Sequence, residues 1–124
     1  MGIISVKGLT VFAYHGVNPE ERENGQYFIL DIEATADLRT ACRSDRLEDT
    51  VSYAKIIKTA RTVFLAQKDL LIERAAQRVA DGLLNEYSSL DEVRVRIKKP
   101  DAPIKAEFDY VAIEIEVKRS YTSP

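Results

Sequence analysis

The chain has 124 residues, 45% of them hydrophobic, so we expect a single domain over residues 1–124 with its core between about residues 4 and 118. Its 18 basic and 20 acidic residues nearly cancel, and no run of lysine or arginine offers the positive surface that nucleic acid requires. The chain has no run of ~18 apolar residues, no secretory signal pattern and one cysteine, Cys42, so we expect a cytoplasmic protein without membrane association.

Two strands are predicted in the first third of the chain. The first 14 residues alternate weakly between apolar and polar, with Gly8 as the expected bulge where the phase slips. From Phe28 to Ala36, apolar side chains occupy every second position, which is typical of a strand with one buried face. Between these strands lies HGVNPEERENGQ, residues 15–26, which contains the chain's only histidine and is predicted to be a loop.

Two amphipathic helices are predicted in the middle third. Residues 37–50 carry mixed charge without a period, and we expect them to be irregular. Apolar residues then recur at helical spacing from Tyr53 to Phe64, with Ser52 as the expected N-cap. A second helical pattern begins at Ile72, with Asp69 as its expected N-cap.

The last third returns to the period of strands. Residues 93–97 and 111–117 alternate between apolar and charged, and the proline-containing segment KPDAPIKAE connects them. The order ββααββ predicts an α+β fold in which two helices pack on one face of an antiparallel sheet. Such a sheet leaves strand edges that recruit another chain unless they are covered, so we expect an oligomer.

Lys99 and Glu73 are the first candidate functional residues. If the strand through Ile97 continues, Lys99 shares its apolar face, where a lysine is suited to proton transfer once a carboxylate or substrate compensates its charge. The alternative is that the strand ends at Lys98 and Lys99 is solvated. Glu73 lies near a helix start, where the dipole stabilises a carboxylate that could accept paired hydrogen bonds from an amidine-like ring edge. An ordinary helix-start residue is the alternative.

Metal chemistry is not predicted. One histidine, one cysteine and no clustered carboxylates at ligand spacing do not supply the ligand set of a transition-metal site. Cys42 lies beside Arg43, but without a histidine partner we interpret it as a small inert residue.

Four segments together carry a resemblance to a known family. YHGVNPEERENGQ, DTVSYAKI, LLIERAA and VRIKKPDAPI, in this order and spacing, resemble the dihydroneopterin aldolase family of folate biosynthesis, over about Ile4 to Val117. The resemblance implies the tunnelling fold, in which the sheets of ββααββ subunits join into a barrel of four subunits. It further implies a homo-oligomer, typically an octamer of two such rings, with active sites at subunit interfaces.

The resemblance also implies the reaction, which is a metal-free and cofactor-free retro-aldol cleavage. The substrate would be 7,8-dihydroneopterin, and the products 6-hydroxymethyl-7,8-dihydropterin and glycolaldehyde. By the same resemblance, Glu73 anchors the 2-amino and N3 edge of the pterin beside the backbone of Ile72, and Leu71 and Val51 line the binding site.

Three residues match the family's catalytic positions. The resemblance makes Lys99 the proton-transfer lysine and Tyr53 a proton donor that lines the site from the neighbouring subunit. It makes Glu21 an acid that positions the substrate hydroxyls, the lysine or a water. Gln26 and His15 are weaker candidates, and a structural hydrogen bond is the alternative for His15.

Two alternative functions remain open at this point. The first is an epimerase acting on dihydroneopterin triphosphate, or C2′ epimerisation alongside cleavage; a triphosphate would require a basic pocket, for which Arg22, Arg43 and Arg46 are the available residues. The second is a non-catalytic oligomeric module that binds a pterin. Zinc-dependent enzymes of the wider fold are disfavoured, because the three-histidine ligand set is absent.

Overall fold

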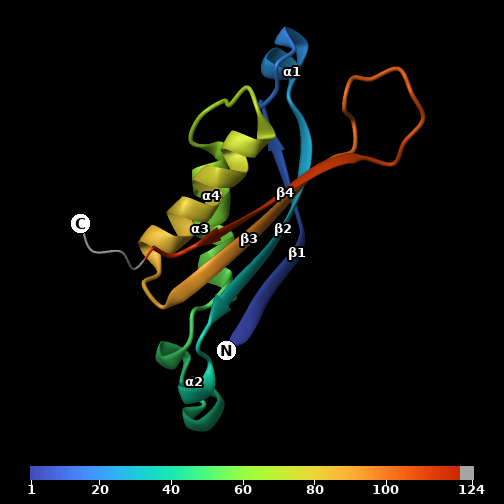
Figure 1. Ribbon diagram of the computed structural model, residues 1–124. Helices are drawn as coiled ribbons and strands as arrows, with labels where there is room; N and C mark the ends of the chain where they lie inside the picture. The colour runs from blue at the N-terminus through green and yellow to red at the C-terminus, as the bar shows by residue number, and fades with distance from the viewer. Residues whose placement is uncertain (121–124) are drawn as a thin grey trace.

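The computed structural model describes residues 1–120, and it consists of one four-stranded antiparallel sheet with two long helices on one face (Figure 1). The strands lie in the order β1-β2-β3-β4, so each is a neighbour of the next along the chain. The long elements are β1 (Gly2–Ala13), β2 (Gln26–Ala36), α3 (Tyr53–Leu65), α4 (Ile72–Glu86), β3 (Leu90–Lys99) and β4 (Val111–Lys118). The predicted α+β class and the ββααββ order of the long elements are confirmed.

Three short helical segments were not expected. The segment predicted to be a loop contains α1 (Pro19–Asn24), and the segment predicted to be irregular contains α2 (Arg39–Ser44) and a 3-10 turn, η1 (Leu47–Asp49). Proline suits the first position of α1, because a backbone N–H at that position has no acceptor within the helix and its absence therefore costs no hydrogen bond. Neither α2 nor η1 buries a residue, so no apolar period exists in their sequence to indicate them.

The core lies between the sheet and the helices. Alternate residues of β2 and β3 face α3 and α4, and neighbouring strands bring them into register, as in the pairs Leu30–Ile97 and Ile32–Val95. The helices contribute fully buried residues to the same core, namely Ile56, Ala60, Phe64, Ala75, Ala76, Val79, Ala80 and Leu83. The predicted phase slip in β1 is confirmed, because the pairing with β2 shifts between Val6 and Leu9 and Gly8 has a φ of 74°.

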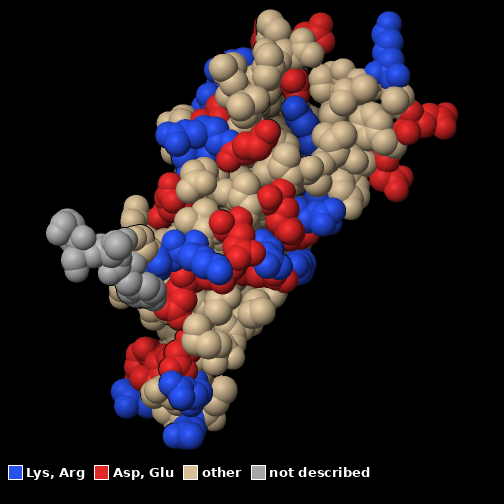
Figure 2. Space-filling view, viewed as in Figure 1, with Lys and Arg blue, Asp and Glu red and all other residues tan. Residues whose placement is uncertain are grey.

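The opposite face of the sheet is charged. Acidic and basic side chains alternate in a band across the strands (Figure 2). Glu33 on β2 accepts from Lys7 at 3.1 Å and from Arg94 at 3.4 Å, and Arg94 also binds Glu116 at 2.7 Å. Such exposed pairs add little stability individually. The strands β1 and β4 form the two edges of the sheet, and no helix within residues 1–120 is long and apolar enough to cross a membrane.

The two helix starts differ from each other. Ser52 occupies the N-cap position of α3, as predicted. The prediction for α4 is wrong, because Leu71 is its N-cap and the carboxylate of Asp69 has another role. Asp69 is 4% exposed and binds the guanidinium of Arg78, which lies within α4 beyond its first turn. The carboxylate of Asp69 therefore forms an ion pair with Arg78 and does not form the cap at the start of α4 that the local spacing had predicted.

Candidate active site

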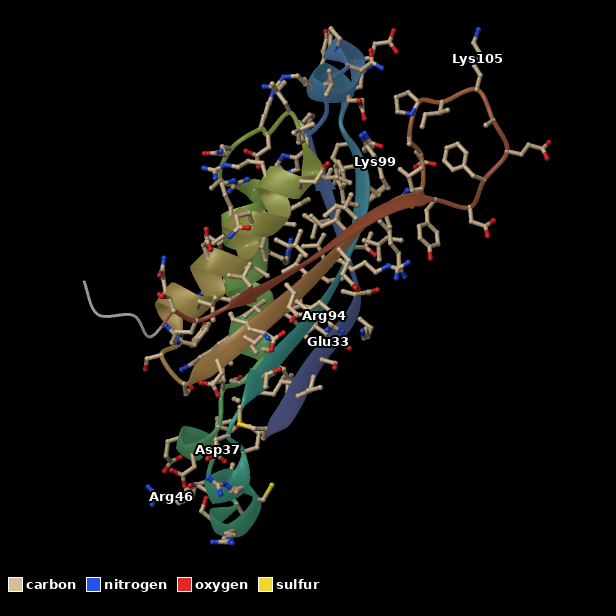
Figure 3. All side chains as sticks on the ribbon, viewed as in Figure 1. Glu33, Asp37, Arg46, Arg94, Lys99 and Lys105 are labelled. Carbon is tan, nitrogen blue, oxygen red and sulfur yellow. The ribbon has the colours of Figure 1, made fainter. Side chains whose placement is uncertain are left out.

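Lys99 and Glu21 form a shielded ion pair at one end of the sheet. The strand β3 continues to Lys99, which pairs with Val111 of β4, so Lys99 keeps the parity of Val95 and Ile97. Its side chain is 13% exposed, and its Nζ contacts Oε2 of Glu21, whose side chain is 8% exposed. The strand thus brings the lysine, which is labelled in Figure 3, to the core side of the sheet. The helix α1 brings the carboxylate of Glu21 to it.

The carboxylate of Glu21 has further partners. Gln26 Nε2 donates to Oε2 at 2.7 Å, and the backbone N–H of Asn18 donates to Oε1 at 3.3 Å. Burial on its own raises the pKa of Glu21, but the hydrogen bonds from Lys99 and Gln26 and the charge of Lys99 outweigh it, and the pKa lies below the usual value. Glu21 is therefore an anion at neutral pH, held beside an ammonium group that can pass a proton to a bound molecule.

Gln26 supplies one more polar atom at this position. It is 8% exposed, and its Oε1 is buried without a hydrogen-bond partner among residues 1–120. A buried acceptor of this kind is costly when it stays unpaired, so Oε1 is suited to accept a hydrogen bond from a bound molecule or a water. Position 26 was only a weak candidate from sequence.

A buried network lies beside the pair and joins three segments of the chain. The backbone N–H of Asp69 donates to His15 Nδ1 at 2.9 Å, which leaves the proton on Nε2, where it is donated to the carbonyl of Phe64 at 3.0 Å. Burial holds the pKa of His15 below its ordinary value, although the charge of Asp69 and the bond to Phe64 oppose this. His15 is thus a neutral structural residue, which was the alternative that the sequence left open.

Arg78 completes that network and was missed by sequence reasoning. Its Nε donates to Asp69 Oδ2 at 3.0 Å, and its Nη2 contacts the same oxygen. Gln67 Nε2 donates to the other carboxylate oxygen at 2.7 Å. Desolvation raises the pKa of Asp69, but the hydrogen bonds from Arg78 and Gln67 lower it by more. No local pattern in the sequence pairs residues 69 and 78, so only the fold could reveal this contact.

The predicted pterin anchor lies at the same end of the molecule. Ile72 and Glu73 begin α4, directly after the loop that Asp69 holds against Gly16 through a backbone bond of 2.9 Å. Glu73 is exposed, Leu71 is 52% exposed, and Ile72 is largely buried. The end of the sheet that carries Lys99, α1 and the start of α4 is called the Lys99 end below.

Tyr53 and Val51 lie at the opposite end. Tyr53 is the first residue of α3, which starts next to η1 at the far end of the sheet from Lys99, where Asp37 and Arg46 are labelled (Figures 1 and 3). This second end is called the Tyr53 end. Tyr53 is 69% exposed, and the buried Val51 borders a surface hollow of ≈ 510 Å³. The single chain therefore separates the predicted site residues into two groups.

The remaining candidate ligands are dispersed. Within residues 1–120, no three His, Cys, Asp or Glu side chains form a group that could hold a metal ion. Cys42 is an exposed free thiol on α2, at the Tyr53 end.

The ββααββ order of the long elements and the strand order of the sheet place the chain in the tunnelling-fold class of α+β proteins. The sequence profile of the dihydroneopterin aldolase family, FolB, matches residues 4–116. The chain belongs to the dihydroneopterin aldolase family. The resemblance noted in the sequence is thereby confirmed.

Individual relatives agree with this assignment. The dihydroneopterin aldolase of Methylorubrum extorquens is 44% identical over 117 residues, which cover 94% of this chain and 90% of the relative. That of Streptococcus pyogenes serotype M18 is 37% identical over 119 residues, covering 96% and 100%. The crystal structure of E. coli dihydroneopterin aldolase in complex with neopterin superposes with a TM-score of 0.86 at 33% identity, covering 94% of this chain and 99% of that one.

Proposed function

We propose that this protein is a dihydroneopterin aldolase, which cleaves 7,8-dihydroneopterin into 6-hydroxymethyl-7,8-dihydropterin and glycolaldehyde. The single observation that carries the proposal is the shielded Lys99–Glu21 pair at the end of β3, in a chain of this family. Shielding the charge of a lysine from water costs more folding free energy than a hydrophobic residue at the same position would. We therefore interpret Lys99 as a residue that serves the chemistry of the site and not the stability of the fold. Its use here is proton transfer.

The chemistry needs proton donors and acceptors rather than an external electron sink. Loss of the proton on the C2′ hydroxyl and cleavage of the C1′–C2′ bond release glycolaldehyde, and the bonding electrons pass through C6 into the ring as N5 gains a proton. Protonation of C1′ and loss of the N5 proton then give 6-hydroxymethyl-7,8-dihydropterin. In this proposal Lys99 transfers protons, Glu21 holds the ammonium group and the substrate hydroxyls, and Tyr53 delivers a proton to the intermediate.

Binding of the ring is assigned to the start of α4. The side chain of Glu73 is exposed, and its carboxylate can accept paired hydrogen bonds from the 2-amino and N3 edge. The backbone of Ile72 and the side chain of Leu71 lie next to it. The complex of the E. coli relative with neopterin supports a pterin as the ligand.

The separation of Tyr53 from Lys99 supports a site shared between subunits. We assign Tyr53 and Val51 to the site of a neighbouring subunit, where the exposed phenol would meet Lys99 and Glu73 of the next chain. The free edges of β1 and β4 offer the surfaces through which sheets could join into a barrel of four subunits. The proposed assembly is a homo-octamer of two such rings, with a single ring as the alternative.

The test is incubation of chelator-treated protein with 7,8-dihydroneopterin, followed by analysis of the products. We expect glycolaldehyde and 6-hydroxymethyl-7,8-dihydropterin in equal amounts, and unchanged turnover after chelation. A product that is only the C2′ epimer would move the function to an epimerase. Tight pterin binding with no product would move it to a non-catalytic module.

A further inference from the structure

Gly16 lies directly against the carboxylate of Glu21. A Cβ atom placed on Gly16 would lie 2.6 Å from both Cδ and Oε1 of Glu21 and 2.8 Å from its Cβ. Carbon and oxygen atoms do not approach so closely without a shift of one partner. The φ of Gly16 is 150°, which L side chains rarely adopt. The glycine therefore leaves the space into which Glu21 folds.

The backbone at Gly16 is held in place from several sides. Its N–H donates to the carbonyl of Asp69 at 2.9 Å, and its carbonyl accepts from Arg22 Nη1 at 3.4 Å. The preceding residue, His15, is 1% exposed, and its ring is bonded to Asp69 on one side and to Phe64 on the other. Residue 16 cannot retreat from Glu21 without breaking these buried hydrogen bonds.

The side chain of Glu21 can be displaced more easily than the backbone of Gly16. Its carboxylate is held by Lys99, by Gln26 at 2.7 Å and by the N–H of Asn18 at 3.3 Å. A side chain at position 16 would push on the carboxyl end of Glu21, because that end is the nearest group. The displacement would separate Glu21 from Lys99 while Lys99 stays on its strand.

We infer that Gly16 is a positioning residue for the Glu21 carboxylate. Because residue 16 has no side chain and its backbone is held by the contacts of His15 and Asp69, the carboxylate of Glu21 fits against Lys99. The catalytic consequence rests on the proposed aldolase function. Gly16 touches neither substrate nor reacting atoms in this proposal, and it acts through Glu21. The start of α4 keeps its own contacts, so binding of the pterin ring is separable from the effect on the pair.

The experiment compares Gly16→Ala with Gly8→Ala. Gly8 has a φ of 74°, and a Cβ there would meet nothing within 4 Å, so this control carries backbone strain at a glycine without the contact. We expect Gly16→Ala to lower kcat by about 100-fold, the effect of displacing a catalytic group by about 1 Å. The effect on pterin affinity should be much smaller, because the ring is assigned to Glu73 and only the contact of Glu21 with the substrate hydroxyls is disturbed. Gly8→Ala should change neither quantity. Wild-type kcat in Gly16→Ala would overturn the inference.

A double-mutant cycle with Glu21→Gly shows whether the effect passes through Glu21, because only glycine also removes the Cβ of residue 21, which would lie 2.8 Å from a Cβ on residue 16. We expect Gly16→Ala to cause little further loss of kcat in the Glu21→Gly background, because every atom that it displaces is gone. An equal loss in both backgrounds would overturn the inference. If Gly16→Ala alone fails to fold, recovery of folding in the double variant supports the contact with Glu21, and failure of the double variant overturns it.

A second readout is independent of the proposed reaction. The side-chain carboxyl of Glu21 can be titrated by NMR in each variant, and loss of Lys99 as a partner should raise its pKa in Gly16→Ala and not in Gly8→Ala. If wild-type protein does not cleave 7,8-dihydroneopterin, the proposed function fails, and this titration still decides the inference. A pKa of Glu21 that is the same in Gly16→Ala and wild type would overturn the positioning role.

Discussion

The two ends of the sheet each contain an aspartate–arginine pair, and the pairs have opposite character. At the Lys99 end, Asp69 and Arg78 have side chains 3% and 12% exposed, and Asp69 also binds His15, which is 54 residues away in sequence. At the Tyr53 end, Asp37 and Arg39 have side chains 47% and 76% exposed and lie two residues apart. The first pair joins separate segments, whereas the second fixes only its own turn.

This difference indicates what each end can do. The groups proposed for catalysis and binding need fixed geometry, and long-range buried contacts at the Lys99 end supply it for Glu21 and for the start of α4. At the Tyr53 end, η1 is held by short-range hydrogen bonds, such as the one that Ser44 Oγ donates to Asp49 at 2.6 Å. Tyr53, at the start of α3, is 69% exposed. The Tyr53 end therefore offers residues to another molecule, in keeping with the proposed shared site.

The largest expected effect comes from removing the amine at the Lys99 end. Lys99→Ala should lower kcat by ~10²–10⁴-fold, the usual contribution of a proton-transfer group, while pterin affinity measured by fluorescence titration stays close to wild type. Lys98→Ala is the matched control, because Lys98 lies on the other face and pairs with Asp31 at 3.3 Å. Turnover that persists in Lys99→Ala would remove the lysine from the mechanism.

The same substitution at the two aspartates tests the contrast in stability. Asp69→Asn leaves the charge of Arg78 without its anion in a buried position, and we expect the free energy of unfolding to fall by about 3–5 kcal/mol. Asp37→Asn, at the exposed pair, should leave stability nearly unchanged because water already solvates both groups. Urea unfolding of both variants measures the difference. Similar losses in the two would contradict the proposed division between the ends.

A smaller effect is expected from pH, and it too belongs to the Lys99 end. The pKa of His15 is lowered in the folded protein, so as pH falls below the ordinary value of 6.5 the unfolded chain takes up the proton first. Stability should fall with decreasing pH by at most ~1.4 kcal/mol per pH unit, until the folded pKa is reached. The pKa of Glu21 is lowered from 4.5, so its stabilising contribution is lost only in a separate, more acidic range.

Urea unfolding across this pH range checks the assignment to His15. His15 is the only histidine in the chain, so His15→Gln removes all histidine titration. The variant should lose the slope just below pH 6.5 and keep the more acidic one. A slope near pH 6.5 that survives in His15→Gln would assign the proton uptake to another group.

The sequence was sufficient for every element that buries a face. The period of two in β2 and β3 predicted the parity of Lys99, and helical spacing predicted α3 and α4, because each pattern reports contact with the core. The helix α2 and the turn η1 bury nothing, so no pattern in their residues could reveal them. For α1, the proline following Asn18 was a usable helix-start signal that the loop interpretation overlooked.

The candidate site was predictable to a smaller extent. Parity on β3 led to Lys99, but its partner Glu21 came only from family resemblance, since the two lie 78 positions apart and no local spacing links them. Arg78 and the true role of Asp69 were missed for the same reason. Contacts between distant segments depend on how the helices and the sheet pack, which the periodicity of a single segment does not encode.

The last prediction concerns the separation of Tyr53 from Lys99. Lys99→Ala and Tyr53→Phe should each be nearly inactive as pure oligomers, because each removes one half of every site. Co-expression of the two variants in equal amounts, with different tags, should restore activity to about one quarter of wild type. A mixed site is active when its Lys99 comes from a Tyr53→Phe chain and its Tyr53 comes from a Lys99→Ala chain. Each of these has a probability of one half, so about one quarter of the sites are active. Restored activity in doubly tagged oligomers supports the shared site, and a mixture no more active than its parents would place Tyr53 outside it.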